Sequence, residues 1–278
     1  MTQFFQSADG LRLAYDDQGS GHPILCLAGL SRNMADFEPV LERFADSARI
    51  IRLDSRGRGQ SDWDPDYLNY TVPQEAQDAL ALLDHLGLDK VTILGTSRGG
   101  LIAMGLAAAV ASRLHGVILN DIGPDLSPQG LTHIMGYLGN RPGYRDYDEA
   151  ATRLPDAMAP AFRNVSHDQW RAYARRLWRQ EPDGLDLRYD PRIARALVEQ
   201  SAAGEAPDLW PLFDALAQLP VGLIRGANSD LLLPETATEM VRRHPGLIYG
   251  EVPDRGHVPF LDEPEAVGVI QTYLEQIS

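Results

Sequence analysis

The chain has 278 residues, a formal net charge of −14 and a single cysteine. The negative charge disfavours binding to nucleic-acid phosphates or to anionic membranes, and one cysteine cannot form an internal disulfide bond. The sequence has no N-terminal apolar stretch or long apolar run, so we expect a cytoplasmic protein. With 44% hydrophobic residues, the chain can bury one large core.

The first predicted element is an antiparallel hairpin at residues 4–15, with Asp9-Gly10 at its centre. After it, short β-branched runs alternate with amphipathic helical stretches. This pattern predicts an α/β fold with a mostly parallel sheet and helices on both faces. The first such run, residues 24–27, contains Cys26 and is followed by Ala28-Gly29-Leu30. We expect Cys26 to be a small buried hydrophobic residue.

Residues 54–61 form a glycine-containing loop, Asp-Ser-Arg-Gly-Arg-Gly-Gln-Ser. The loop lacks the third glycine of a dinucleotide-binding fingerprint, since Asp62 stands in that place. The sequence also lacks the His-Glu-x-x-His metal motif. We therefore expect no cofactor and no metal. An amphipathic stretch, residues 74–86, then precedes the next strand-like run.

The most informative motif is Gly95-Thr96-Ser97-Arg98-Gly99, between the apolar run 91–94 and the alanine-rich stretch 100–111. A serine hydroxyl can attack a substrate only if it protrudes toward a base. A tight turn between a buried strand and a helix achieves this, and flanking glycines remove Cβ clashes. The start of the helix also favours negative charge near the hydroxyl. The motif predicts that Ser97 is a nucleophile.

The pattern changes between residues 124 and 209, where proline and glycine separate short helices and strands disappear. We predict a helical lid at 124–209, inserted into a core formed by 1–123 and 210–278. Helical spacing places four residues on one apolar stripe: Trp170, Tyr173, Leu177 and Trp178. A stripe across the top of the sheet would roof an apolar pocket over Ser97. Trp170 and Trp178 are therefore candidate substrate-binding residues.

The predicted general base is His257, which lies between a strand-like run at 247–252 and a last helix that starts near Pro264. Loops at this end of a strand carry the chemistry of open α/β sheets. Val258, the next residue, is a candidate substrate contact. The predicted acid is Asp230, in the loop after the strand 221–224. Asp121, which directly follows the strand 117–120, is the alternative; if Asp230 is the acid, Asp121 becomes a pocket wall.

Together these segments resemble an α/β-hydrolase of the esterase, lactonase and carbon–carbon bond hydrolase kind. Ala28-Gly29 stands where the family usually has His-Gly, and residues 54–61 resemble its Asp-x-Arg-Gly-x-Gly-x-Ser loop. The resemblance covers residues 4–122 and 219–278. It implies that the backbone N–H groups of Leu30 and Arg98 form an oxyanion hole. The Arg98 side chain either pairs with carboxylates of the scaffold or leans toward the pocket.

The resemblance and the order serine, acid, histidine imply a serine hydrolase that forms an acyl-enzyme with a small to medium-sized apolar ester or lactone. Carbon–carbon bond hydrolysis of vinylogous diketones and cofactor-free perhydrolysis share this triad and stay open. A small-molecule receptor on the same fold is the alternative from another class. The expected partner is a small-molecule substrate rather than a nucleic acid or a membrane, and a homo-oligomer is possible.

Overall fold

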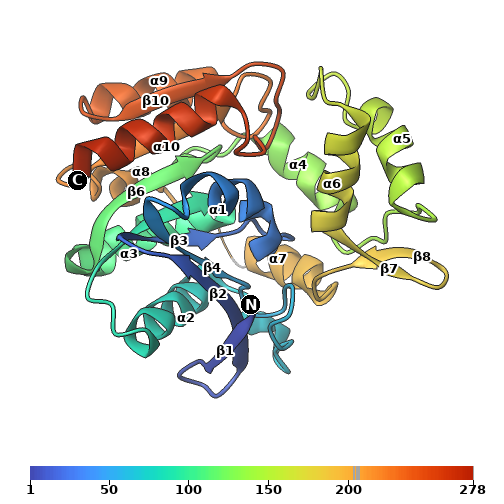
Figure 1. Ribbon diagram of the computed structural model, residues 1–278, viewed down its shortest axis with the longest axis horizontal. Helices are drawn as coiled ribbons and strands as arrows, with labels where there is room; N and C mark the ends of the chain where they lie inside the picture. The colour runs from blue at the N-terminus through green and yellow to red at the C-terminus, as the bar shows by residue number, and fades with distance from the viewer. Residues whose placement is uncertain (203, 205–206, 278) are drawn as a thin grey trace.

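The computed structural model describes residues 1–202, 204 and 207–277 (Figure 1). Its main sheet has eight strands in the order β1-β2-β4-β3-β5-β6-β9-β10. Four residues of the predicted lid and core, 203, 205, 206 and 278, lie outside the described part. The strands of the sheet are β1 (Gln3–Gln6), β2 (Arg12–Gly19), β3 (His22–Leu27), β4 (Ala48–Leu53), β5 (Val91–Thr96), β6 (Leu114–Asn120), β9 (Val221–Gly226) and β10 (Ile248–Val252).

The sheet is mostly parallel, as the sequence predicts. Only the pairs that involve β2 are antiparallel, and they comprise the predicted N-terminal hairpin with Phe4 opposite Ala14 and the contact of β2 with β4. From β4 to β10 every neighbouring pair runs parallel. The carboxyl ends of β3, β5, β6, β9 and β10 therefore share one edge, which is where open α/β sheets place their sites.

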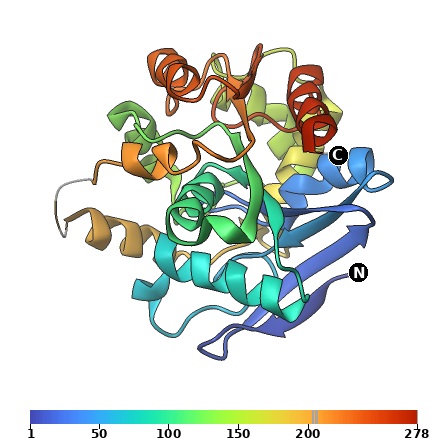
Figure 2. The same cartoon turned by 90° about the vertical axis from the view of Figure 1, so that its left-hand side faces the viewer.

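Both faces of the sheet are covered by helices (Figure 2). Successive residues of β3 alternate between two apolar clusters: Leu25 and Leu27 belong to one, and Ile24 and Cys26 to the other. The first cluster packs against α2 (Val72–His85), α3 (Arg98–Val110), α8 (Trp210–Asp214) and α9 (Pro234–Arg243). The second packs against α1 (Glu38–Phe44) and α10 (Pro264–Ile277). Burial on both faces explains why the strands read as continuous apolar runs.

The helix before β5 shows how the local sequence sets an element boundary. Thr71 caps α2, because its hydroxyl accepts a hydrogen bond from the N–H of Gln74 at 3.2 Å. Pro73 lies in the first turn, where its missing N–H is tolerated.

Among the described helices, none is long and apolar enough to cross a bilayer. Three short 3₁₀ helices lie among the described residues before β6: η1 (Met34–Phe37), η2 (Tyr67–Asn69) and η3 (Ala111–Arg113).

The lid segment, residues 124–209, lies beside the carboxyl edge of the sheet (Figure 1). It holds α4 (Pro128–Tyr137), α5 (Tyr147–Ala157), α6 (His167–Leu177) and α7 (Arg192–Ala202). The prediction that strands disappear here is wrong, because β7 (Trp178–Glu181) and β8 (Gly184–Leu187) form an antiparallel hairpin. Trp178 begins β7 and is not on the helical stripe. Pro182-Asp183-Gly184 is a turn signal that marks this hairpin.

Glycines of α3 give a matched test of the packing around Ser97. A Cβ on Gly99 would lie 2.0 Å from the carbonyl oxygen of Leu27, whereas a Cβ on Gly105 would meet nothing within 4 Å. We expect Gly99→Ala to destabilise the protein by about 2 kcal/mol or more, because α3 must move from β3. Gly105→Ala should stabilise it by up to about 1 kcal/mol through helix propensity. Urea unfolding measures both, and equal stabilities would contradict the close packing.

Candidate active site

Ser97 occupies the sharp turn between β5 and α3. Its backbone has φ 50° and ψ −116°, a conformation that residues with a Cβ rarely adopt. The turn is held by the N–H of Ser97, which donates to the carbonyl of Asn120 at 3.0 Å, and by the N–H of Gly100, which donates to the carbonyl of Ser97 at 2.8 Å. The predicted strand–turn–helix context of the serine is therefore present.

Three side chains from different loops form a chain of hydrogen bonds. The Oγ of Ser97 lies 3.0 Å from the Nε2 of His257, and the Nδ1 of His257 lies 2.7 Å from an Oδ of Asp121. The histidine side chain is 12% exposed and the aspartate side chain is fully buried. The structure thus brings Ser97 and His257 together as predicted, with the alternative aspartate as the third member.

The Asp121 carboxylate is fixed from several sides. The N–H of Gly226 donates to one oxygen at 2.7 Å, and the hydroxyl of Ser229 donates to the other at 2.6 Å. The backbone N–H of Asp121 in turn donates to the carbonyl of Ile224 at 2.7 Å. The hydrogen bonds from Gly226 and Ser229 are of the kind that an ionised carboxylate, which only accepts, can receive. The groups that hold Asp121 come from β9 and the loop after it.

The prediction that Asp230 accepts the hydrogen bond of His257 is wrong. Asp230 is partly exposed, and its carboxylate lies 3.1 Å from the Nδ1 of His133 in α4. The loop after β9 turns tightly, since the N–H of Ser229 donates to the carbonyl of Gly226 at 2.9 Å. This turn directs Ser229 inward onto Asp121 and leaves Asp230 on the outside. Asp121 is therefore part of the hydrogen-bonded triad and not the pocket wall expected of it.

The backbone N–H groups of Leu30 and Arg98 border the same serine. Arg98 is the first residue of α3, and a Cβ on Gly29 would lie 3.7 Å from the Cβ of Ser97. Among the hydrogen bonds of the described residues, neither N–H has an acceptor. The Nε of Arg58 donates to the carbonyl of Leu30 at 2.9 Å and so fixes this loop. Both N–H groups are thus free of an acceptor among the described residues, and their role as oxyanion donors stays a prediction.

The Arg98 side chain belongs to the scaffold. Its guanidinium binds both oxygens of Glu75, at 2.9 Å or slightly more, and the carbonyl of Tyr70 at 2.9 Å. Arg58 binds the same Glu75 carboxylate at 2.9 Å. Burial raises the pKa of Glu75, but the charges of Arg58 and Arg98 outweigh this effect and hold the pKa below its usual value. Of the two predicted roles for Arg98, the structural one is confirmed.

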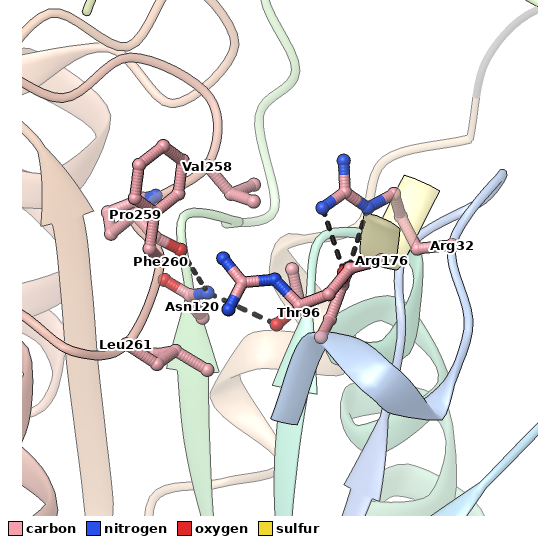
Figure 3. Close-up of a pocket in the computed structure, with 9 residues that line it drawn as sticks. Arg32, Thr96, Asn120, Arg176, Val258, Pro259, Phe260 and Leu261 are labelled. Atoms are coloured by element: carbon pink, nitrogen blue, oxygen red, sulfur yellow. Dashed lines mark hydrogen bonds and ion pairs between the residues drawn. The ribbon is translucent and has the colours of Figure 1, made fainter. Parts of the chain in front are cut away.

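A small cavity is lined in part by the chain neighbours of two triad residues (Figure 3). Val258, which follows His257, and Thr96, which precedes Ser97, both contribute to its wall. The cavity is more polar than the predicted apolar pocket. Its other lining residues are Arg32, Asp36, Asn120, Arg176, Pro259, Phe260 and Leu261. Sequence reasoning missed the two arginines and Asn120, although Asn120 directly precedes Asp121.

The predicted aromatic roof packs behind this cavity. Trp170 is 1% exposed and meets Phe260 edge-on, with 5.9 Å between ring centroids. Phe162 and Tyr173 complete the cluster around Phe260, at 5.5 and 5.0 Å. Trp178 packs against Tyr144 at 5.4 Å. Neither tryptophan lines the cavity, so their predicted substrate contact is replaced by support of Phe260 and of the hairpin.

Among the described residues, no group of three or more His, Cys, Asp or Glu side chains is arranged to hold a metal ion. Cys26 is buried, as predicted, within β3.

The fold and the serine–histidine–aspartate geometry are those of an α/β hydrolase. Residues 24–268 match the alpha/beta hydrolase family, and the chain belongs to it. It is 38% identical to a 3-hydroxybutyrate-oligomer hydrolase of Cupriavidus necator, over 93% of this chain and 91% of the relative. It is 28% identical to an N-formylmaleamate deformylase of Pseudomonas putida, over 91% and 88% of the two chains. A solved α/β hydrolase from Novosphingobium aromaticivorans superposes with a TM-score of 0.93 at 38% identity, covering 99% and 98%.

Glu75 offers a test of the charged network below the site. Glu75→Gln keeps the shape of the side chain but leaves the buried guanidinium groups of Arg58 and Arg98 without their anion. We expect a loss of about 3–5 kcal/mol of stability, because an uncompensated buried charge is costly. Urea unfolding measures the loss. The control is Glu239→Gln, which removes a partly exposed partner of Arg242 and Arg243 and should cost far less stability than Glu75→Gln. Similar results for the two variants would contradict the role of Glu75.

Proposed function

We propose that this chain hydrolyses esters of short hydroxycarboxylic acids through an acyl-enzyme on Ser97. The observation that carries the proposal is the hydrogen-bonded series from Ser97 to His257 to Asp121, with distances of 3.0 and 2.7 Å. The relative from Cupriavidus necator, similar along most of both chains, is a hydrolase of 3-hydroxybutyrate oligomers. Such oligomers are linked by ester bonds, and the polar cavity lined by Thr96 and Val258, the chain neighbours of Ser97 and His257, suits them better than a purely apolar acyl chain.

In the first half of the reaction, Ser97 is acylated. Asp121 accepts the Nδ1–H of His257, so that Nε2 is free to take the proton of the Ser97 hydroxyl. The Oγ attacks the ester carbonyl carbon, and the developing oxyanion accepts hydrogen bonds from the N–H groups of Leu30 and Arg98. When the carbon–oxygen bond of the ester breaks, His257 gives its Nε2 proton to the leaving alkoxide.

In the second half, water hydrolyses the acyl-enzyme. His257, neutral again, takes a proton from the water while the water oxygen attacks the acyl carbon. The same two N–H groups stabilise the second oxyanion. The bond to Ser97 Oγ then breaks, the proton returns from His257 to Oγ, and the carboxylic acid leaves. These steps use only groups of this chain and one water molecule.

Lactone hydrolysis fits the same steps, since a lactone is an internal ester. Carbon–carbon bond hydrolysis and perhydrolysis need the same triad, and a receptor needs only the cavity. The assay that separates these classes is turnover of a 3-hydroxybutyrate dimer against a vinylogous diketone and against hydrogen peroxide with acetate. We expect continuous release of 3-hydroxybutyrate. A single burst without turnover would support the receptor instead.

Ser97→Ala tests the nucleophile. Removing the hydroxyl should abolish turnover of the dimer, with a loss of up to about 10⁶ in kcat by analogy with other serine hydrolases. Circular dichroism and thermal unfolding should show an intact fold, because alanine fits where serine does. A variant that keeps more than about a tenth of the activity would overturn acyl-enzyme formation on Ser97.

Asparagine substitutions compare the two aspartates. Asp121→Asn presents an amide to His257 and permits the wrong tautomer, which in the serine protease template lowers kcat by roughly 10⁴. Asp230→Asn should change kcat by less than about threefold, because among the described residues this carboxylate bonds His133 and not His257. Initial rates on the dimer, with a folding check for each variant, measure the difference. Greater damage from Asp230→Asn would return the acid role to Asp230.

A further inference from the structure

Within the part of the chain that the structure describes, Arg176 is a buried cation without a counter-ion. The residue is 8% exposed, and its Nε has no hydrogen-bond partner. Among the described residues, its guanidinium makes no ion pair and no hydrogen bond; only its backbone carbonyl is bonded, to the Nδ2 of Asn33 at 2.7 Å. Six other buried arginines all bind a carboxylate, and they are Arg52, Arg56, Arg58, Arg98, Arg225 and Arg255. Arg176 departs from the rule by which this protein buries its arginines.

The guanidinium of Arg176 lines the small polar cavity (Figure 3). It enters from α6 of the lid segment and lies near Asn120 and Thr96, with its central carbon 6.0 Å from the centre of the Phe260 ring. The Oδ1 of Asn120 is also buried without a partner. Thr96 and Val258, which also line this cavity, are the chain neighbours of Ser97 and His257.

The charge of the cavity wall is not balanced. Arg32 and Asp36 form a two-pronged pair, with distances of 2.6 and 2.8 Å, and Arg32 also donates to the hydroxyl of Tyr173 at 3.1 Å. This pair is neutral as a unit. The charge of Arg176 therefore remains, in surroundings where an unpaired charge is unfavourable. A ligand with one negative charge would neutralise it, and a guanidinium matches a carboxylate in shape and hydrogen-bond direction.

We propose that Arg176 binds the carboxylate of an anionic substrate and so makes the enzyme selective for esters that carry a free acid. This inference rests on the proposed ester hydrolysis and names its substrate class. In a 3-hydroxybutyrate dimer, the carboxylate belongs to the leaving hydroxy acid, and its binding would direct the ester carbonyl toward Ser97. The unpaired Oδ1 of Asn120 is an acceptor for a substrate hydroxyl. The substrates in the names of two relatives, 3-hydroxybutyrate oligomers and N-formylmaleamate, are also carboxylates.

The test compares the 3-hydroxybutyrate dimer with its methyl ester, which has the same scissile bond but no charge. We expect Arg176→Gln to lower kcat/KM on the acid about 10- to 100-fold, mainly through KM, and to change the methyl ester less than about threefold. Arg176→Lys should restore part of the preference. The matched control is Arg175→Gln, the same change one residue earlier on the exposed side of α6, which should affect both substrates by less than about twofold.

A second measurement keeps this inference separate from the proposed reaction. Calorimetry with Ser97→Ala reports binding of the dimer and of its methyl ester whether or not the protein cleaves them. We expect the acid to bind more tightly and Arg176→Gln in the same background to remove the difference. Failure of hydrolysis with preserved selectivity of binding would overturn only the proposed function. Equal binding of acid and methyl ester, or equal losses on both substrates, would overturn the role of Arg176.

Stability provides an independent readout. If Arg176 serves a ligand, it costs the free protein stability, so Arg176→Gln should unfold at the same temperature as the wild type or higher. If Arg176 is a structural residue, the variant should unfold earlier or fail to fold, and the proposal is overturned. For the wild type alone, inhibition by 3-hydroxybutyrate but not by its amide is the expected result; equal inhibition by both would contradict carboxylate binding.

Discussion

The backbone conformation of Ser97 is the constraint on which the rest of the site depends. A residue with a Cβ is held at φ 50° only where its surroundings enforce the conformation. Here the enforcement is contact between backbones: a Cβ on Gly95 would lie 2.5 Å from the backbone of Gly99 and Gly100, and one on Gly99 would strike the carbonyl of Leu27. The direction of the hydroxyl is therefore fixed by how closely α3 approaches β3 and β5.

Buried ion pairs connect the segments that surround Ser97. Glu75 of α2 binds Arg98 of α3 and Arg58 of the loop after β4, and Arg58 also binds the carbonyl of Leu30. One buried carboxylate thus connects the loops that carry both proposed oxyanion donors. Backbone packing orients Ser97, whereas the ion pairs of Glu75 fix the positions of Arg98 and of the loop that contains Leu30. This division explains why Arg98, one residue from the nucleophile, does not face the cavity.

The features that could be predicted from the sequence are those fixed by short-range pattern. The glycine spacing predicts the turn at Ser97, and the apolar runs predict the parallel strands. His257 is chosen because it follows a strand-like run. The acid could not be chosen in this way, because Asp121 and Asp230 both follow strands; the outcome depends on β6 lying between β5 and β9, and on the turn that directs Ser229 inward. Arg176 was missed because clustered arginines on an amphipathic helix normally face solvent, and only tertiary packing buries this one.

Because the Asp121 carboxylate directly follows β6, the loop after β9 does not itself carry the aspartate of the triad. The last residue of β9, Gly226, gives its backbone N–H to Asp121 and Ser229 of that loop gives its hydroxyl, while the carboxylate of Asp230 lies 3.1 Å from the Nδ1 of His133 on α4. One short loop therefore serves two separate tasks: Ser229 holds the Asp121 carboxylate, and Asp230 ties the loop to α4 of the lid segment. Replacing residue 230 would change the attachment of α4 without removing any hydrogen bond of Asp121.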